Sequence, residues 1–276
     1  MRQRVMLKHA LVHALLWCGV ALMLMPLIWT LSTSLKPVSQ IFLFPPQWIP
    51  NPIRWQNYVE AVTAIPFARY LFNTALITGL VIVGKVFSVT LVAFAFARLQ
   101  WWGRDALFLI MLATLMLPTH ITLIPQFVMF KQLGWINTFL PLIVPDFFGG
   151  PFLTFLMRQF FMSLPHDLDD AARIDGCSSF GVYWRIILPL SKPAIVAAVI
   201  LTFNNTWNDF LHPLIYLQSP DNFTLALGLR FFQGEASTSW NLLMAASLLT
   251  MLPVITLFFV AQRYFIQGIV FTGVKS

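Results

Sequence analysis

The sequence is poor in charged residues. Only 10% of its 276 residues are Asp, Glu, Lys or Arg, whereas 58% are hydrophobic. Soluble domains carry about 25% charged and about 45–50% apolar residues, so this composition excludes an ordinary soluble domain. The chain is therefore expected to be an integral membrane protein.

Cysteine is also scarce, and metal-binding side chains do not cluster. Cys18 and Cys177 are the only cysteines, and they are predicted to lie in a span and in a cytoplasmic loop, so we expect no disulfide. His9 and His13 have the spacing of metal ligands on a helix, but no carboxylate or cysteine stands nearby to complete a site. A membrane enzyme is therefore the weakest interpretation.

A credible nucleotide-binding motif is missing too. The run from Gly79 to Lys85 has the spacing of a phosphate-binding loop, but Val86 stands where a Ser or Thr would bind magnesium. The run also belongs to a long apolar segment with no preceding strand. We expect this chain itself to bind no cofactor.

The apolar runs lack the alternation of barrel strands, so the spans must be helices. A spanning helix needs about 20 apolar residues, which leaves room for about six spans. We expect an all-α polytopic membrane protein, with spans near 10–35, 70–97, 106–130, 138–162, 194–217 and 242–261. The predicted organisation is an N-terminus at 1–9, span one at 10–35, an outside segment at 36–68, a transmembrane core at 69–262 and a tail at 263–276.

The basic residues set the expected topology. The formal net charge is +7, and these spans place about eleven Lys and Arg inside against about five outside, as the positive-inside rule requires. Both termini and the loop at 163–193 are then cytoplasmic. This rule explains the positive charge without a nucleic-acid partner.

Several predicted spans contain polar residues that a lipid-facing helix would not carry. A charge at membrane depth is costly, so Lys85 should face a polar cavity or a carboxylate. Pro118 and Pro125 are expected to break span three around His120, and span four should be discontinuous in its outer half, where Asp146 lies near the outer interface. The substrate-path candidates are Lys85, His120, Asn204, Asn205, Trp207, Asn208 and Asp209. The alternatives are a structural ion pair for Lys85, a packing kink for span three, and interhelical hydrogen bonds for span five.

The loop at 163–193 is the most charged run of the chain. Ser163 is expected to cap a first helix, Gly176 to end it, and Ser178 or Ser179 to begin a second helix that ends at Pro189 and Pro193. The helical period predicts two faces of the first helix: Leu164, Leu168, Ala171 and Ala172 against His166, Asp169, Asp170 and Arg173. A helix lying on lipid would favour Lys and Arg on its polar face, so the aspartates favour a protein partner over an interfacial helix.

The order Asp170-Ala-Ala, Gly176 and Ile186-x-Leu188-Pro189 resembles the EAA loop of ABC importer permeases, with Asp170 in place of the usual Glu. A carboxylate is retained there. Three further segments are similar to the carbohydrate-uptake branch of maltose-type permeases: Ala93-Phe-Ala-Phe-Ala-Arg98, Trp207-Asn-Asp-Phe-Leu-x-Pro213 and Gly273-Val-Lys-Ser276. The resemblance covers most of the chain.

This resemblance implies a type I ABC importer fold in the bacterial inner membrane, with segment 36–68 periplasmic. It implies four kinds of partner: a second homologous permease, a dimer of cytoplasmic ATPase subunits that hold ATP and magnesium, an extracytoplasmic solute-binding protein, and membrane lipid. The residues it assigns to ATPase coupling are Leu168, Asp170, Ala171, Ala172, Asp175, Gly176, Ile186, Leu188, Pro189, Gly273 and Lys275.

The expected function is to form half of a pathway for a sugar or a glycerol-phosphate-like polyol. If Lys85 faces the pore, an anionic solute is favoured. The alternative is a secondary transporter driven by an ion gradient, with Lys85 and Asp209 as its coupling pair. That alternative leaves the acidic loop unexplained, and paired broken spans in inverted repeats are not evident.

Overall fold

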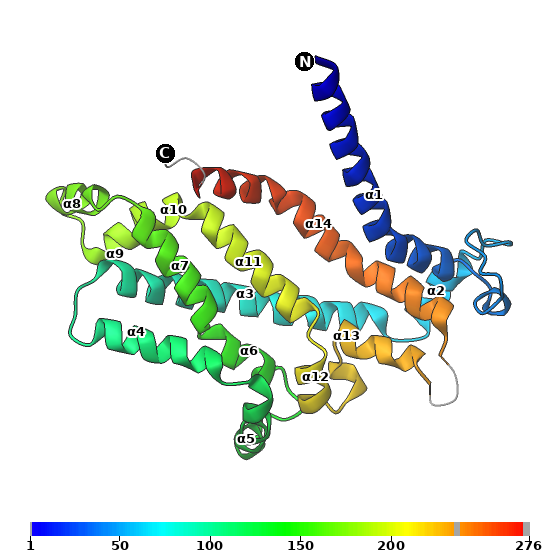
Figure 1. The fold of residues 1–276 in the computed structure, drawn as a ribbon. Coiled ribbons are helices and arrows are strands. Elements are labelled where there is room, and N and C mark those ends of the chain that lie inside the picture. The colour runs from blue at the N-terminus through cyan, green and yellow to red at the C-terminus, as the bar shows by residue number, and fades with distance from the viewer. Residues whose placement is uncertain (1, 235–237, 273–276) are drawn as a thin grey trace. The chain divides into compact units, whose positions relative to one another are not determined.

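The computed structural model describes residues 2–234 and 238–272, and within them the chain forms helices and no β-strand (Figure 1). The α-helices are α1 (Arg2–Ser34), α2 (Gln56–Thr63), α3 (Phe67–Arg98), α4 (Arg104–Ala113), α5 (Thr119–Gln132), α6 (Leu140–Phe147), α7 (Pro151–Ser163), α8 (Asp167–Ile174), α9 (Ser179–Val182), α10 (Leu188–Leu190), α11 (Lys192–Trp207), α12 (Leu211–Tyr216), α13 (Leu225–Gly228) and α14 (Trp240–Thr272). A π-helical turn, η3 (Tyr183–Ile187), joins α9 to α10. Short 3-10 turns are η1 (Val38–Gln40), η2 (Thr114–Met116), η4 (Pro220–Asn222) and η5 (Leu229–Phe232). The expected all-α fold is confirmed.

Four helices of the described chain are long and apolar enough to cross a membrane: Leu11–Ser34, Phe67–Arg98, Leu140–Ser163 and Trp240–Gln262. Two helix pairs pass the same test only together, because each is sharply bent. They are Arg104–Met116 with Thr119–Gln132, bent by 97°, and Ser179–Leu190 with Lys192–Trp207, bent by 78°. The count of candidate spans is therefore four, or up to six if each bent pair is one span.

The chain divides into two compact units, Met1–Ala68 with Gly228–Leu252, and Arg69–Leu227 with Pro253–Ser276. In the first unit, Asn57 of α2 ties together three segments. Its side-chain amide donates to the carbonyls of Ser34 (2.8 Å) and Lys36 (2.9 Å), and its oxygen accepts from Asn241 at the start of α14 (3.1 Å). The end of α1 is thereby held to α2 and α14.

The second unit is built on α3, which extends over the whole predicted second span. Two hydrophobic clusters pack along this helix. One gathers Val89, Ala93 and Phe94 of α3 with residues of α7, α8, η3 and α11. The other gathers Ile77 and Val81 of α3 with residues of α5, α6 and α12. The loop at 163–193 is thus packed onto the spans and does not project freely.

Prolines interrupt the helices at fewer positions than predicted. Pro118 precedes α5, where the chain bends, but Pro125 lies inside α5 and does not break it. A proline within a span removes one backbone hydrogen bond, and a helix tolerates this loss when its neighbours compensate. Span four is discontinuous, because Gly149 and Gly150 separate α6 from α7.

Two expectations for the 163–193 loop were wrong. Ser163 is the last residue of α7 and does not cap α8, which begins at Asp167. Asp169 was also placed on the wrong face of α8. Asp169 faces inward beside Ala172, because Arg98 provides a buried partner for its carboxylate.

Three loop expectations hold. The second helix ends at Leu190, between Pro189 and Pro193, where the chain bends by 78° into α11. Gly176 follows the last turn of α8 with a φ of +81°, a left-handed conformation that glycine adopts without strain. Ser178 caps α9, because its hydroxyl oxygen accepts from the Gly181 N–H at 3.2 Å.

Candidate functional site

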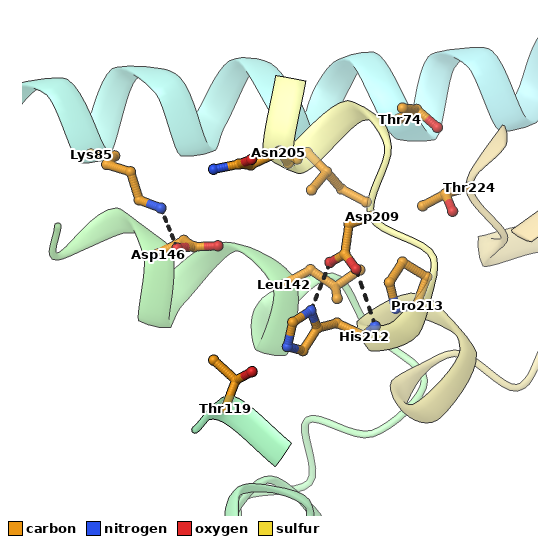
Figure 2. A pocket seen from close by; sticks show the side chains of 12 residues that line it. Thr74, Lys85, Thr119, Leu142, Asp146, Asn205, Asp209, His212, Pro213 and Thr224 are labelled. Atoms are coloured by element: carbon orange, nitrogen blue, oxygen red, sulfur yellow. Dashed lines mark hydrogen bonds and ion pairs between the residues drawn. The ribbon is translucent and has the colours of Figure 1, made fainter. Parts of the chain in front are cut away.

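A cavity of about 360 Å³ lies inside the second unit, beside the middle of α3 (Figure 2). Its walls come from α3, α6 and the α11–α12 region, with Thr119 from α5. The lining residues are Thr74, Ile77, Lys85, Thr119, Leu142, Asp146, Asn205, Thr206, Asp209, His212, Pro213 and Thr224. We call it the central cavity.

Lys85 lines the central cavity and forms an ion pair with Asp146 of α6. The lysine side chain is 15% exposed and the carboxylate 49% exposed. Lys85 therefore has both features that the sequence allowed, a carboxylate partner and a polar cavity. Sequence reasoning missed Asp146 as its partner, although Asp146 is the single acid in predicted span four and Lys85 required one.

Gly84 explains how α3 and α6 come close enough for this pair. A Cβ atom at Gly84 would overlap the ring of Phe147, the residue after Asp146. Ser88, one turn further along α3, donates to the Phe147 carbonyl at 2.9 Å. The glycine thus leaves space for the aromatic ring. With Phe147 packed there, the preceding residue of α6, Asp146, lies beside Lys85 of α3.

A second carboxylate, that of Asp209, lies across the central cavity, as Figure 2 shows. Asp209, in the break between α11 and α12, contacts His212 of α12. Its carboxylate oxygens lie 2.9 Å from the His212 Nδ1 and 3.3 Å from the His212 backbone N–H. The ion pair of Lys85 with Asp209 suggested for an ion-driven transporter is not formed, because each residue has another partner.

The central cavity brings together three of the seven substrate-path candidates: Lys85, Asn205 and Asp209. The other four lie elsewhere. Asn208 donates to the backbone and side-chain oxygens of Asn204 (2.8 and 3.1 Å). Trp207 is buried and stacks on Phe203 at 5.0 Å between ring centroids. His120 is exposed on α5, next to the lining residue Thr119.

At the C-terminal end of α3, one buried arginine, Arg98, binds the start of the 163–193 loop. The Nη2 of Arg98 donates to the carbonyls of Phe161 (2.6 Å) and Leu164 (2.8 Å). Its Nη1 lies 3.1 Å from the His166 Nδ1 and 3.5 Å from the Asp169 carboxylate. Sequence reasoning missed the pair of Arg98 with Asp169 because it ended span two just before the arginine and placed the aspartate on the face of the helix opposite Ala172.

The coupling candidates fall into two groups by burial. Ala172 is buried, and Ile186 and Leu188 pack partly buried against the same hydrophobic cluster. The exposed group is Leu168, Asp170, Ala171, Asp175, Gly176 and Pro189. Asp170 lies 3.7 Å from Arg173 in an exposed pair. Gly273 and Lys275 lie outside the described residues.

The described residues contain no group of three or more His, Cys, Asp or Glu side chains arranged to hold a metal ion. The central cavity instead offers amide, hydroxyl and internally paired charged groups. Such a lining can hydrogen-bond a polar solute.

Comparison with protein families identifies the chain. Residues 88–270 match the family described as "Binding-protein-dependent transport system inner membrane component". The chain belongs to this family. It is a permease subunit of a binding-protein-dependent ABC importer, an inner-membrane transport component rather than an enzyme, and no comparison supports the ion-coupled transporter.

Curated relatives match nearly the whole permease. The probable ABC transporter permease protein YurM of Bacillus subtilis is 33% identical and covers 91% of this chain and 83% of its own. The arabinooligosaccharides transport system permease protein AraQ of Halalkalibacterium halodurans is 36% identical, with 82% of this chain and 81% of its own covered. The sn-glycerol-3-phosphate transport system permease protein UgpE of Yersinia enterocolitica is 34% identical and covers 94% of both.

A solved structure shows the same fold. A chain from the crystal structure of a bacterial ABC transporter involved in the import of the acidic polysaccharide alginate superposes with a TM-score of 0.82. It is 23% identical, and the alignment covers 94% of the permease and 96% of that chain. This likeness supports the importer fold assigned from the sequence.

Proposed function

We propose that this permease forms half of the pathway for an uncharged, hydroxyl-rich solute such as an oligosaccharide, and that the central cavity is part of that pathway. The named systems of its relatives differ in solute charge, because an arabinooligosaccharide is neutral and sn-glycerol 3-phosphate is an anion. The chemistry of the cavity favours the neutral class.

The pairing of charges inside the central cavity carries this proposal. Lys85 is the single Lys or Arg among the lining residues, and Asp146 neutralises it. Asp209 adds a second carboxylate, and His212 at most balances it when protonated. A phosphate or uronate would therefore meet no uncompensated cation here, whereas the Asn205 amide and the threonine hydroxyls can bind sugar hydroxyls.

The Asp146 pair also reverses the expectation that Lys85 in the pore favours an anionic solute. A lysine whose charge is already matched gains little from a second anion, and an anion would be repelled by Asp209. Among the substrate-path candidates, the proposal rests on Lys85, Asn205 and Asp209.

The importer we propose has the partners that the loop motif implies: a second permease, two ATPase subunits that hold ATP and magnesium, and an external solute-binding protein. Both termini and the 163–193 loop are cytoplasmic. The exposed residues Asp170, Ala171 and Gly176 contact an ATPase, and Ile174 beside them, 86% exposed, supports a protein contact at this surface. Gly273 and Lys275 are proposed for the same interface.

Uptake in the native host tests the solute class. Cells that contain this permease are compared with cells from which its gene is deleted. The comparison measures uptake of labelled neutral oligosaccharides, sn-glycerol 3-phosphate and an oligouronate. We expect the deletion to abolish uptake of at least one of the neutral oligosaccharides. Loss of phosphate or uronate uptake instead would overturn the proposal.

A matched pair of variants tests the cavity. Asn205→Leu removes an amide from the cavity wall, while Asn204→Leu makes the same change one residue away, outside the lining. Losing one hydrogen bond to a neutral solute should raise the half-saturation concentration for uptake by roughly 3- to 10-fold in Asn205→Leu. Equal effects of the two variants would remove the cavity from the pathway.

A further inference from the structure

The side chain of Arg98 lies where three structural elements meet, the end of α3, the end of α7 and the start of α8. It is 0% exposed, and the Asp169 side chain that it faces is 3% exposed. Its four contacts all reach one stretch of chain, from Phe161 to Asp169. In Figure 1, α8 lies beside the loop end of α3.

The contacts of Arg98 span the short turn, residues 164–166, between α7 and α8. The Phe161 carbonyl lies in the last turn of α7, where it also accepts from the Leu164 N–H at 3.2 Å, and Leu164 directly follows this helix. Asp169 lies in the first turn of α8. A single guanidinium therefore connects both sides of this turn to α3.

Folding stability alone does not explain a charged pair at this position. Removing two charges from water is unfavourable, and well-packed apolar side chains often replace a buried ion pair without loss of stability. Arg98 Nε and Asp169 Oδ1 are also buried without a hydrogen-bond partner among the described residues. The pair does fix the relative orientation of the segments it joins, because the planar guanidinium of an arginine contacts several acceptors in one geometry.

The helix that Arg98 ends also lines the central cavity. Lys85 precedes Arg98 by 13 residues, about 20 Å along a helix. No proline interrupts α3 between them. A displacement of α8 that reached Arg98 would therefore be carried along α3 to the residues around Lys85.

We propose that Arg98 is a positioning residue that locks α8 and the end of α7 to α3, so that movement of α8 displaces the cavity-lining helix. This inference rests on the proposed contact of α8 with the ATPases. The positioning pair, Arg98 with Asp169, acts through α3 and does not touch solute or nucleotide.

The test compares Arg98→Lys and Asp169→Asn with Asp105→Asn in the complete transporter. Lysine keeps the charge but loses the fork, and Asp105 belongs to an exposed pair with Arg104. The measurements are ATPase copurification, ATP hydrolysis, and solute transported per ATP. We expect both positioning variants to retain the ATPases and to hydrolyse ATP while transport per ATP is lost. Wild-type transport per ATP in both would overturn the proposal.

A measurement on the otherwise unaltered transporter covers the case in which these variants fail to fold. Spin labels on Gln100, two residues beyond Arg98, and on Arg173 of α8 report the distance between the two elements. We expect this distance to stay the same when ATP binds. A change on ATP binding would show that α8 moves independently of α3, whereas failure of the ATPases to bind the loop at all would instead count against the proposed function.

Discussion

Individual charged residues are buried in different ways in this permease. Lys85 and Arg98 each have a carboxylate within reach, whereas the Lys36 amine is fully buried without a hydrogen-bond partner among the described residues. The Lys36 Nζ lies 4.1 Å from the ring centre of Trp29. The aromatic face offsets part of the loss of hydration. Burial nevertheless lowers the pKa of the Lys36 amine below its ordinary value of 10.5.

Lys36→Met should therefore stabilise the protein at neutral pH, by about 1 kcal/mol, because it removes a buried polar group without a partner. The unfolded chain holds the Lys36 proton up to a higher pH than the folded chain. The wild-type free energy of unfolding consequently rises with pH until about 10.5, and the advantage of the variant shrinks over the same range. Thermal unfolding of the wild type and the variant, measured at several pH values, checks both the stability gain at neutral pH and its decrease as the pH rises. A less stable variant at neutral pH would show that the amine has a partner in the assembled transporter.

Two glycines of α3 offer a matched test of the contact that places Asp146. A Cβ at Gly79 meets nothing within 4 Å, whereas a Cβ at Gly84 overlaps the Phe147 ring. Gly79→Ala should stabilise the helix by up to about 1 kcal/mol. Gly84→Ala should destabilise the protein by about 1–3 kcal/mol through overpacking.

The readouts for this glycine pair are the unfolding temperature and uptake. Gly84→Ala should lower both, because it displaces Asp146 from Lys85. Phe147→Leu in the Gly84→Ala background should recover part of the loss. Similar effects of the two alanine variants would contradict the close approach of α3 and α6.

At the scale of elements, α8 shows what the sequence could and could not predict. Asp167 to Gly176 follow local rules, acids in a first turn and glycine after a last turn, so the helix and its end were predictable. The side of α8 that faces the protein was not, because it depends on Arg98, a residue distant in sequence. The same holds for Lys85, whose need for a carboxylate was predictable but not the identity of Asp146.

The exposed end of α8 gives a prediction for ATPase docking. A glycine in another turn of the chain serves as its control. Gly176 and Gly134 both have a positive φ, +81° and +69°, and an added Cβ meets nothing within 4 Å at either. Arginine therefore imposes the same backbone strain at the two positions. Gly176→Arg should abolish ATPase copurification and uptake, while Gly134→Arg should keep the ATPase. Normal association in Gly176→Arg would contradict the proposed coupling surface.

At the scale of the whole molecule, hydropathy predicted helices over all six apolar segments, and prolines and glycines predicted the breaks in spans three and four, but the break of span five between Trp207 and Leu211 was not predicted. The 97° bend between Arg104–Met116 and Thr119–Gln132 arises at Pro118, and the second proline, Pro125, does not add another. Sequence supplies the positions where a helix can break, and tertiary packing decides which of them do. The inside–outside assignment came from charge bias alone, so it requires a direct test.

The two native cysteines make that test simple. With Cys18→Ser, the half-buried Cys177 of the 163–193 loop becomes the single thiol. A membrane-impermeant maleimide should label it in inside-out vesicles and not in intact cells, because the positive-inside rule places this loop in the cytoplasm. The reciprocal control is a cysteine-free chain carrying Ser39→Cys in the exposed segment after α1, which should react in intact cells. Labelling of Cys177 in intact cells would show that the 163–193 loop is outside the cytoplasm, the reverse of the proposed topology. A loop on that side could not reach a cytoplasmic ATPase.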